Sequence, residues 1–101
     1  MSDQDIRAEI RIPTENLPKD IPFFTKTLKM RMDMIYPADN PQIAVFSGHG
    51  IRLRVENGAA EAPATLRILT DNPDDFADGA RVLTAPNGTK VEIDALNPPV
   101  V

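Results

Sequence analysis

Apolar and charged side chains alternate along much of the chain. In residues 6–12, apolar residues at the even positions alternate with Arg7, Glu9 and Arg11. A repeat of two residues is typical of a strand with one buried face, and Pro13 is expected to end this strand. Similar patterns predict strands over residues 30–36, 42–46, 51–56 and 65–70, and a closing hairpin of residues 82–86 and 89–94 around an Asn-Gly pair.

Two segments depart from the strand pattern. Apolar residues recur at helical spacing in residues 20–28, which predicts a short helix with Pro22 in its first turn, where proline is tolerated. In residues 72–79, an asparagine in the N-cap position, a following proline and early acidic residues predict one short helical turn. The elements therefore run β-α-β-β-β, followed by a shorter strand, turn and hairpin.

The chain length limits how these elements can be grouped. At 101 residues the chain has the usual size of one domain, so residues 1–101 are expected to form a single α+β domain. Met30, Met32 and Met34 follow strand spacing, and we expect all three in the core rather than in a binding stripe.

Composition excludes several classes of function. The chain has no cysteine, which excludes disulfides, thiolate metal sites and a cysteine nucleophile, and fits a reducing compartment. A net charge of -4 argues against nucleic-acid binding. Neither a secretory signal nor an apolar run of membrane-spanning length is present, so we expect a cytoplasmic protein that does not associate with membranes.

Two segments carry a family resemblance. Residues 23–30 read Phe-Phe-Thr-Lys-Thr-Leu-Lys-Met, and residues 85–93 read Ala-Pro-Asn-Gly-Thr-Lys-Val-Glu-Ile. The first looks like the helix-to-strand segment, and the second like the closing hairpin, of the glyoxalase/bleomycin-resistance, or vicinal oxygen chelate, superfamily. The resemblance implies a glyoxalase-like half-barrel with a mixed or antiparallel sheet.

The chain departs from the family pattern in two places. Lys29 stands where the family usually has a glycine, and the second module is abbreviated, with only a short helical turn where the family has a full helix. A shortened module leaves a sheet edge and a cleft that a second copy of the chain would cover. We therefore expect a homodimer.

The resemblance also implies where a metal would be held. In metal-dependent members the ligands lie on the first and fifth strands and on the closing hairpins. Carried over by position, this gives Arg7, Ala64 or a neighbour, and Glu92. Only Glu92 can ligate, because a protonated guanidinium has no available lone pair. Glu9 and His49 are the candidates to complete the set, although the glycines beside His49 also fit an exposed turn residue.

One face of the predicted sheet gathers charge. Placing the apolar side of each strand against the helix leaves seven basic and five acidic residues on the other side, including six of the seven arginines. They are Arg7, Glu9, Arg11, Arg31, Asp33, Arg52, Arg54, Glu56, Arg67, Lys90, Glu92 and Asp94. Arginine recognises carboxylate and phosphate through several planar donors, so this face is a candidate site for an anionic small molecule. Alternatively, its charges pair across strands and bind nothing.

Three functions remain open at this point. The first is a small-molecule-binding module without a complete metal site, with Arg7, Arg52, Arg54 and Arg67 as anion contacts and no cofactor. The second is a lyase, isomerase or dioxygenase dependent on a divalent metal. The third is a subunit whose charged sheet meets a partner protein. Because one fold hosts binding proteins and several chemistries, the incomplete ligand set favours the first.

Overall fold

The structure is a computed structural model that describes residues 8–96. The first module contains β1 (Ile10–Thr14), α1 (Leu17–Pro22), η1 (Phe23–Thr27), β2 (Arg31–Tyr36), β3 (Ile43–Gly48) and β4 (Ile51–Asn57). The second contains β5 (Thr65–Thr70), η2 (Phe76–Gly79), β6 (Val82–Thr84) and β7 (Lys90–Ala95). The predicted β-α-β-β-β order is confirmed, and η2 takes the place of a full helix in the second module.

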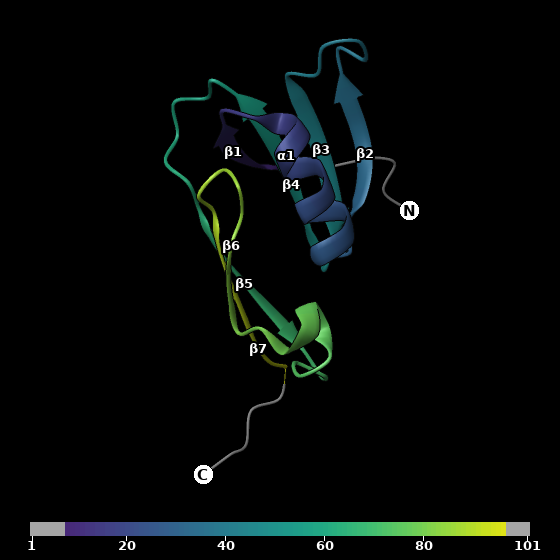
Figure 1. Cartoon of the computed structure of the whole chain (residues 1–101), viewed down its shortest axis with the longest axis vertical. Helices are drawn as coiled ribbons and strands as arrows, with labels where there is room; N and C mark the ends of the chain where they lie inside the picture. The colour runs from purple at the N-terminus through teal and green to yellow at the C-terminus, as the bar shows by residue number, and fades with distance from the viewer. Residues whose placement is uncertain (1–7, 97–101) are drawn as a thin grey trace, which may run out of the picture.

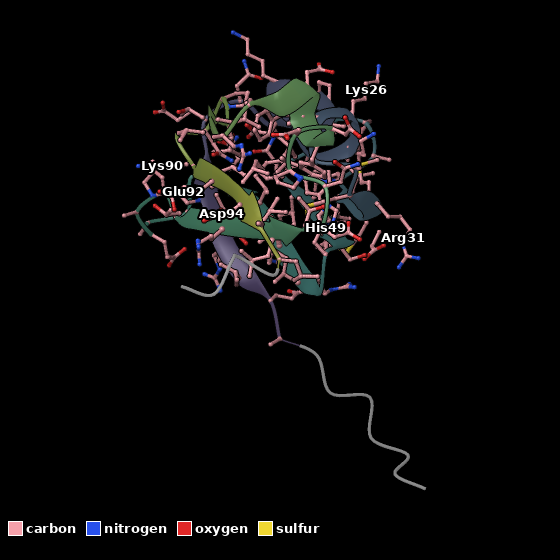
Figure 2. All side chains as sticks on the ribbon, turned by 90° about the horizontal axis from the view of Figure 1, so that it is seen from below. Lys26, Arg31, His49, Lys90, Glu92 and Asp94 are labelled. Atoms are coloured by element: carbon pink, nitrogen blue, oxygen red, sulfur yellow. The ribbon has the colours of Figure 1, made fainter. Side chains whose placement is uncertain are left out.

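Each module forms its own mixed sheet. The first has the order β1-β4-β3-β2 and the second the order β5-β7-β6. The β1–β4 and β5–β7 pairs are parallel, whereas the other neighbours are antiparallel. In Figure 1 the two sheets lie one above the other, and Figure 2 shows the helical segments of both modules on the same side of the sheets. The arrangement is the predicted α+β class.

The helix begins earlier than its apolar spacing predicts. It starts at Leu17, with Pro18 in the first turn, so Pro22 lies inside the helix rather than near its start. Since proline has no N–H to donate, the regular hydrogen-bond series is interrupted there. The next segment is a π-turn, in which the Leu28 N–H donates to the Phe23 carbonyl at 3.0 Å.

The prediction that Pro13 ends the first strand is wrong. Pro13 lies within β1, opposite Glu56 of β4, and the strand continues to Thr14. Because β1 is the edge strand of its sheet, a residue without an N–H can occupy it where no second neighbour needs the donor. The predicted start of this strand, residues 6 and 7, lies outside the described residues.

The strand β2 contains a bulge that changes which side chains face the core. Met32 pairs with Phe46 but Met34 pairs with Val45, so Asp33 is an extra residue between them. An inserted residue reverses the faces of the side chains that follow it, which here affects Met34 but not Met32. Met30 is buried, but Met32 and Met34, both on an edge strand, are 39% and 38% exposed, so the prediction that all three are in the core is wrong.

The core runs through both modules. Its centre is the stacked pair Phe24 and Phe46, whose ring centroids are 5.1 Å apart. The other buried apolar residues of this cluster are Ile12, Leu17, Leu28, Met30, Ala44, Leu53, Val55, Leu66, Ile68, Ala85, Val91 and Ile93. Among residues 8–96, no helix is long and apolar enough to cross a membrane.

Candidate functional site

The charged face of the first sheet is organised around Arg52. Its Nε donates to Glu9 at 2.8 Å and its Nη1 donates to Asp33 at 3.0 Å. The bulge places Asp33 where it also accepts from Arg31 Nε at 2.6 Å. Hydrogen bonds from Ser47 and Arg31, reinforced by the charges of Arg31 and Arg52, lower the pKa of Asp33. Arg52 is thus held by two carboxylates.

The other arginines described on this sheet also have acidic partners. Arg54 Nε donates to Glu56 at 2.9 Å, with both side chains partly buried. Arg11 lies 3.8 Å from Glu61 in an exposed pair. Arg7, a predicted anion contact, lies outside the described residues. The described part of this face therefore carries the cross-strand and neighbouring ion pairs of the alternative interpretation.

The ion pair of Arg67 is more exposed to solvent than the ion pairs of Arg52. Its Nη2 donates to Asp94 across the β5–β7 pair at 2.7 Å, but the two side chains remain 58% and 48% exposed. Hydrogen bonds from Arg67 and the Ala95 backbone lower the pKa of Asp94. An exposed ion pair is screened by water and salt and is weakly held. Arg67 is therefore held less firmly than Arg52.

A groove of about 450 Å³ lies where the β3–β4 turn meets β5 and the end of β7. It is lined by His49, Ile51, Arg67, Ile68, Leu69 and Leu96. Its volume is typical of a small-molecule site, and its walls are mostly apolar with two polar groups. The structure thus brings together two predicted site residues, His49 and Arg67, from different modules.

The His49 side chain links the two modules. The residue is in the left-handed conformation, with φ of 53° at the β3–β4 turn, and the chain there is exposed. Its Nε2 donates to the Leu28 carbonyl at 2.5 Å, and its ring lies edge-on to Phe76 of η2, 5.5 Å between centroids. These contacts hold the imidazole beside the groove.

The three candidate metal ligands do not come together. Glu9 is bound to Arg52, Glu92 lies 3.5 Å from Lys90, and His49 bonds to a backbone carbonyl. Figure 2 shows Glu92 beside Lys90 and Asp94, with His49 apart from them. Within residues 8–96, no three histidine or acidic side chains lie close enough to hold a metal ion. The donor set that the resemblance implies does not fit a metal here.

Sequence analysis missed a buried polar cluster between the modules. Asp20 of α1 is fully buried and accepts a hydrogen bond from the Thr14 hydroxyl. Burial raises the pKa of Asp20, and hydrogen bonds from Thr14 and from Asn87 in the β6–β7 turn oppose that shift. Asp20 Oδ1, Asn87 Nδ2 and the buried Thr89 hydroxyl lack a partner with full hydrogen-bond geometry. Neither spacing nor composition distinguishes Asp20 from an ordinary helix-start aspartate.

The structure is similar to solved structures of one superfamily, although no protein-family model and no curated protein sequence matches the chain. TnmS3, an antibiotic binding protein from a Streptomyces species, aligns with a TM-score of 0.71 at 11% identity over 94% of this chain and 99% of that one. Lactoylglutathione lyase from Agrobacterium tumefaciens gives 0.67 at 13% identity over 92% and 96%.

A third similar structure is the bleomycin-binding protein from Streptomyces verticillus, in complex with copper(II)-bleomycin. It aligns with a TM-score of 0.64 at 14% identity, over 93% of this chain and 98% of that one. These likenesses confirm the fold inferred from residues 23–30 and 85–93. The chain therefore has the glyoxalase-like fold of the glyoxalase/bleomycin-resistance, or vicinal oxygen chelate, superfamily.

Proposed function

We propose that this chain is a small-molecule-binding protein whose ligand lies in the groove between the modules, with Arg67 as its main anion contact. The observation that carries the proposal is the meeting of His49 and Arg67 with apolar walls in one groove of suitable size. The ligand class is a small amphipathic anion, because the apolar wall suits a hydrocarbon part and Arg67 suits a carboxylate or phosphate.

The ion pairs of the arginines support this choice of contact. The Arg52 side chain is 23% exposed and forms ion pairs with two carboxylates. If Arg52 turned to a ligand, the negative charges of Glu9 and Asp33 would lose the positive charge that neutralises them. The exposed pair of Arg67 and Asp94 can be exchanged at a lower cost. In the proposal, Arg52 and Arg54 contribute positive charge to the electrostatic field near the groove without contacting the ligand. Arg7 remains a predicted anion contact.

The similar structures support binding rather than a particular reaction. Two of them are named for binding bleomycin or an antibiotic, and one is a lyase. Fold alone does not decide among such functions. The separation of Glu9, His49 and Glu92 favours a binding protein over the metal-dependent alternative.

The test is a thermal-shift screen with hexanoate, salicylate, succinate and phenyl phosphate. At least one should raise the melting temperature by mass action, and added salt should reduce the shift because ions screen charged contacts. Arg67→Ala should abolish the shift. The control is Arg81→Ala, whose exposed pair with Asp74 lies outside the groove lining. A blank screen, or a shift that survives Arg67→Ala, would contradict the proposal.

A second proposal concerns assembly. The edge strands β2 and β6 carry exposed apolar residues, Tyr36 at 63% and Val82 at 58%, beside the partly exposed Met32 and Met34. Exposed apolar positions on an unpaired edge favour association, so we propose a homodimer. The same association would fit the alternative of a subunit that meets a partner protein. Sedimentation velocity decides: a monomer well above micromolar concentration would exclude it. The cytoplasmic location remains a prediction.

A further inference from the structure

A second cavity, of about 490 Å³, lies at the junction of three loops. The β1–α1 segment, the β4–β5 loop and the β6–β7 turn each contribute to its lining, and it shares no lining residue with the groove of His49 and Arg67. Its volume is within the range of small-molecule sites.

Three prolines lie in the walls of this cavity. Pro13 comes from the end of β1, Pro63 from the β4–β5 loop and Pro86 from the β6–β7 turn, and each has a fixed φ. The β6–β7 turn is seated closely on the β4–β5 loop, since a Cβ placed on Gly88 would lie 3.4 Å from Pro63. Proline has less backbone freedom to lose than other residues when a ligand orders the wall beside it.

The buried cluster around Asp20 holds the cavity's polar residues in place. Thr14 donates to Asp20 and accepts the Asn16 N–H at 3.1 Å. Asn87 accepts the Thr89 N–H at 2.9 Å, while its buried Nδ2 lacks a partner with full hydrogen-bond geometry. These contacts explain how Thr14 and Asn87 are positioned in the cavity wall.

Two opposite charges line the cavity. Lys19 of α1 and Glu15 of the β1–α1 segment both contribute to it, and both are exposed. Neither forms an ion pair with another residue of the described range 8–96. A cation and an anion on one rim are complementary to a ligand that carries both charges.

We propose that this cavity binds a small zwitterion with an apolar side chain, of the class of the free aromatic amino acids. Lys19 contacts the carboxylate, Glu15 contacts the ammonium, and the ring lies against the prolines. Among residues 8–96, the groove of His49 and Arg67 has no acidic lining residue, so the two sites take different classes of ligand.

The proposal is tested by titrating L-phenylalanine into the ¹⁵N-labelled full chain and following amide chemical shifts. Saturable changes are expected at Gly58, which lines the cavity, and at Gly88, in the turn beside it. The single-charge analogues 3-phenylpropanoate and phenethylamine should each bind about tenfold more weakly, since each loses one charge-assisted contact. Equal affinity for all three compounds would overturn the proposal.

Variants separate this site from the groove. Lys19→Ala and Glu15→Gln should each weaken L-phenylalanine binding about tenfold, whereas Lys26→Ala, the matched helical control outside the cavity, should leave it unchanged. Arg67→Ala should also leave it unchanged while removing anion binding in the groove. Absence of saturable shifts at about 20 mM ligand, or full binding by Lys19→Ala, would overturn the inference without affecting the proposed function.

Discussion

Replacement of Asp20 tests whether the buried cluster joins the two modules as the structure indicates. Asp20 is fully buried, accepts from Thr14, and lies against Asn87 of the second module. The carboxylate has two separable effects: it provides acceptors for neighbouring donors, and its charge is costly to bury. Asp20→Ala removes both effects, whereas Asp20→Asn removes the ionisable group, keeps one acceptor oxygen and replaces the other oxygen with an NH2 donor.

The magnitude for Asp20→Ala follows from the donor that it leaves unpaired. The Thr14 hydroxyl loses its acceptor, and a buried unpaired donor costs about 1–3 kcal/mol; Asn87 Nδ2 already lacks a partner with full hydrogen-bond geometry and is not counted. We therefore expect the free energy of unfolding to fall by about 1–3 kcal/mol. A loss of this size is a large part of the roughly 5–15 kcal/mol that stabilises a typical domain.

The pH dependence has a definite sign. Burial raises the folded-state pKa of Asp20 above the ordinary value of 3.8. The wild type therefore has a stabilising contribution below that value, which is lost as pH rises through the folded-state pKa. Asparagine does not titrate, so the stability of Asp20→Asn relative to wild type should increase over this interval and then level off.

Urea unfolding of both variants and the wild type, from about pH 3.5 to 8, measures these differences. Comparison at each pH cancels the opposite effect of Asp33 and Asp94, whose lowered pKa values make stability fall with acid. Asp39→Asn, in the exposed β2–β3 loop, is the matched control. A relative stability of Asp20→Asn that is constant or falls with pH would refute the reasoning, as would an Asp20→Ala effect below about 1 kcal/mol.

Other perturbations test the core, the charged face and the metal alternative. Phe46→Ala, at a fully buried position, should cost about 3–5 kcal/mol by urea unfolding, whereas Met34→Ala, on the exposed side of the bulge, should cost far less; equal effects would contradict the described bulge. Arg52→Ala should lower the melting temperature more than Arg67→Ala, because its two ion pairs are less exposed, and the reverse order would be contrary evidence. Zinc, manganese, nickel and iron(II) should not raise the melting temperature; a rise of several degrees that disappears in Glu92→Ala would make Glu92 a ligand.

Sequence analysis succeeded where local chemistry determines the structure. The Asn-Gly pair at 87–88 predicted the closing hairpin, in which Ala85 N–H donates to Thr89 at 2.8 Å. Alternation predicted β5 to the residue. It failed where a neighbouring element decides. Pro13 is tolerated because β1 lies at a sheet edge, and the extra residue in β2 is visible only in its pairing with β3.

The site was harder to predict because its residues are brought together by the docking of two modules. His49 and Arg67 were identified separately, as a turn residue and a strand arginine, and nothing in their spacing indicates one groove. Asp20 carried even less signal, since its partner Asn87 lies far along the chain. Alternation predicted which charged residues share one face of the sheet. It could not predict which arginine has a nearly buried acidic partner, because that depends on cross-strand register and on the bulge at Asp33.

The two proposed binding sites lie at the module junction, whereas the described arginines of the first sheet all have acidic partners. Arg52 of β4 pairs with Glu9, which precedes β1, and with Asp33 of β2, so its charge is already compensated on this face of the first sheet. At the junction, elements from separate sheets meet without a shared hydrogen-bond ladder, and their polar side chains have fewer partners fixed by register. The groove beside Arg67 and the cavity beside Lys19 both lie there.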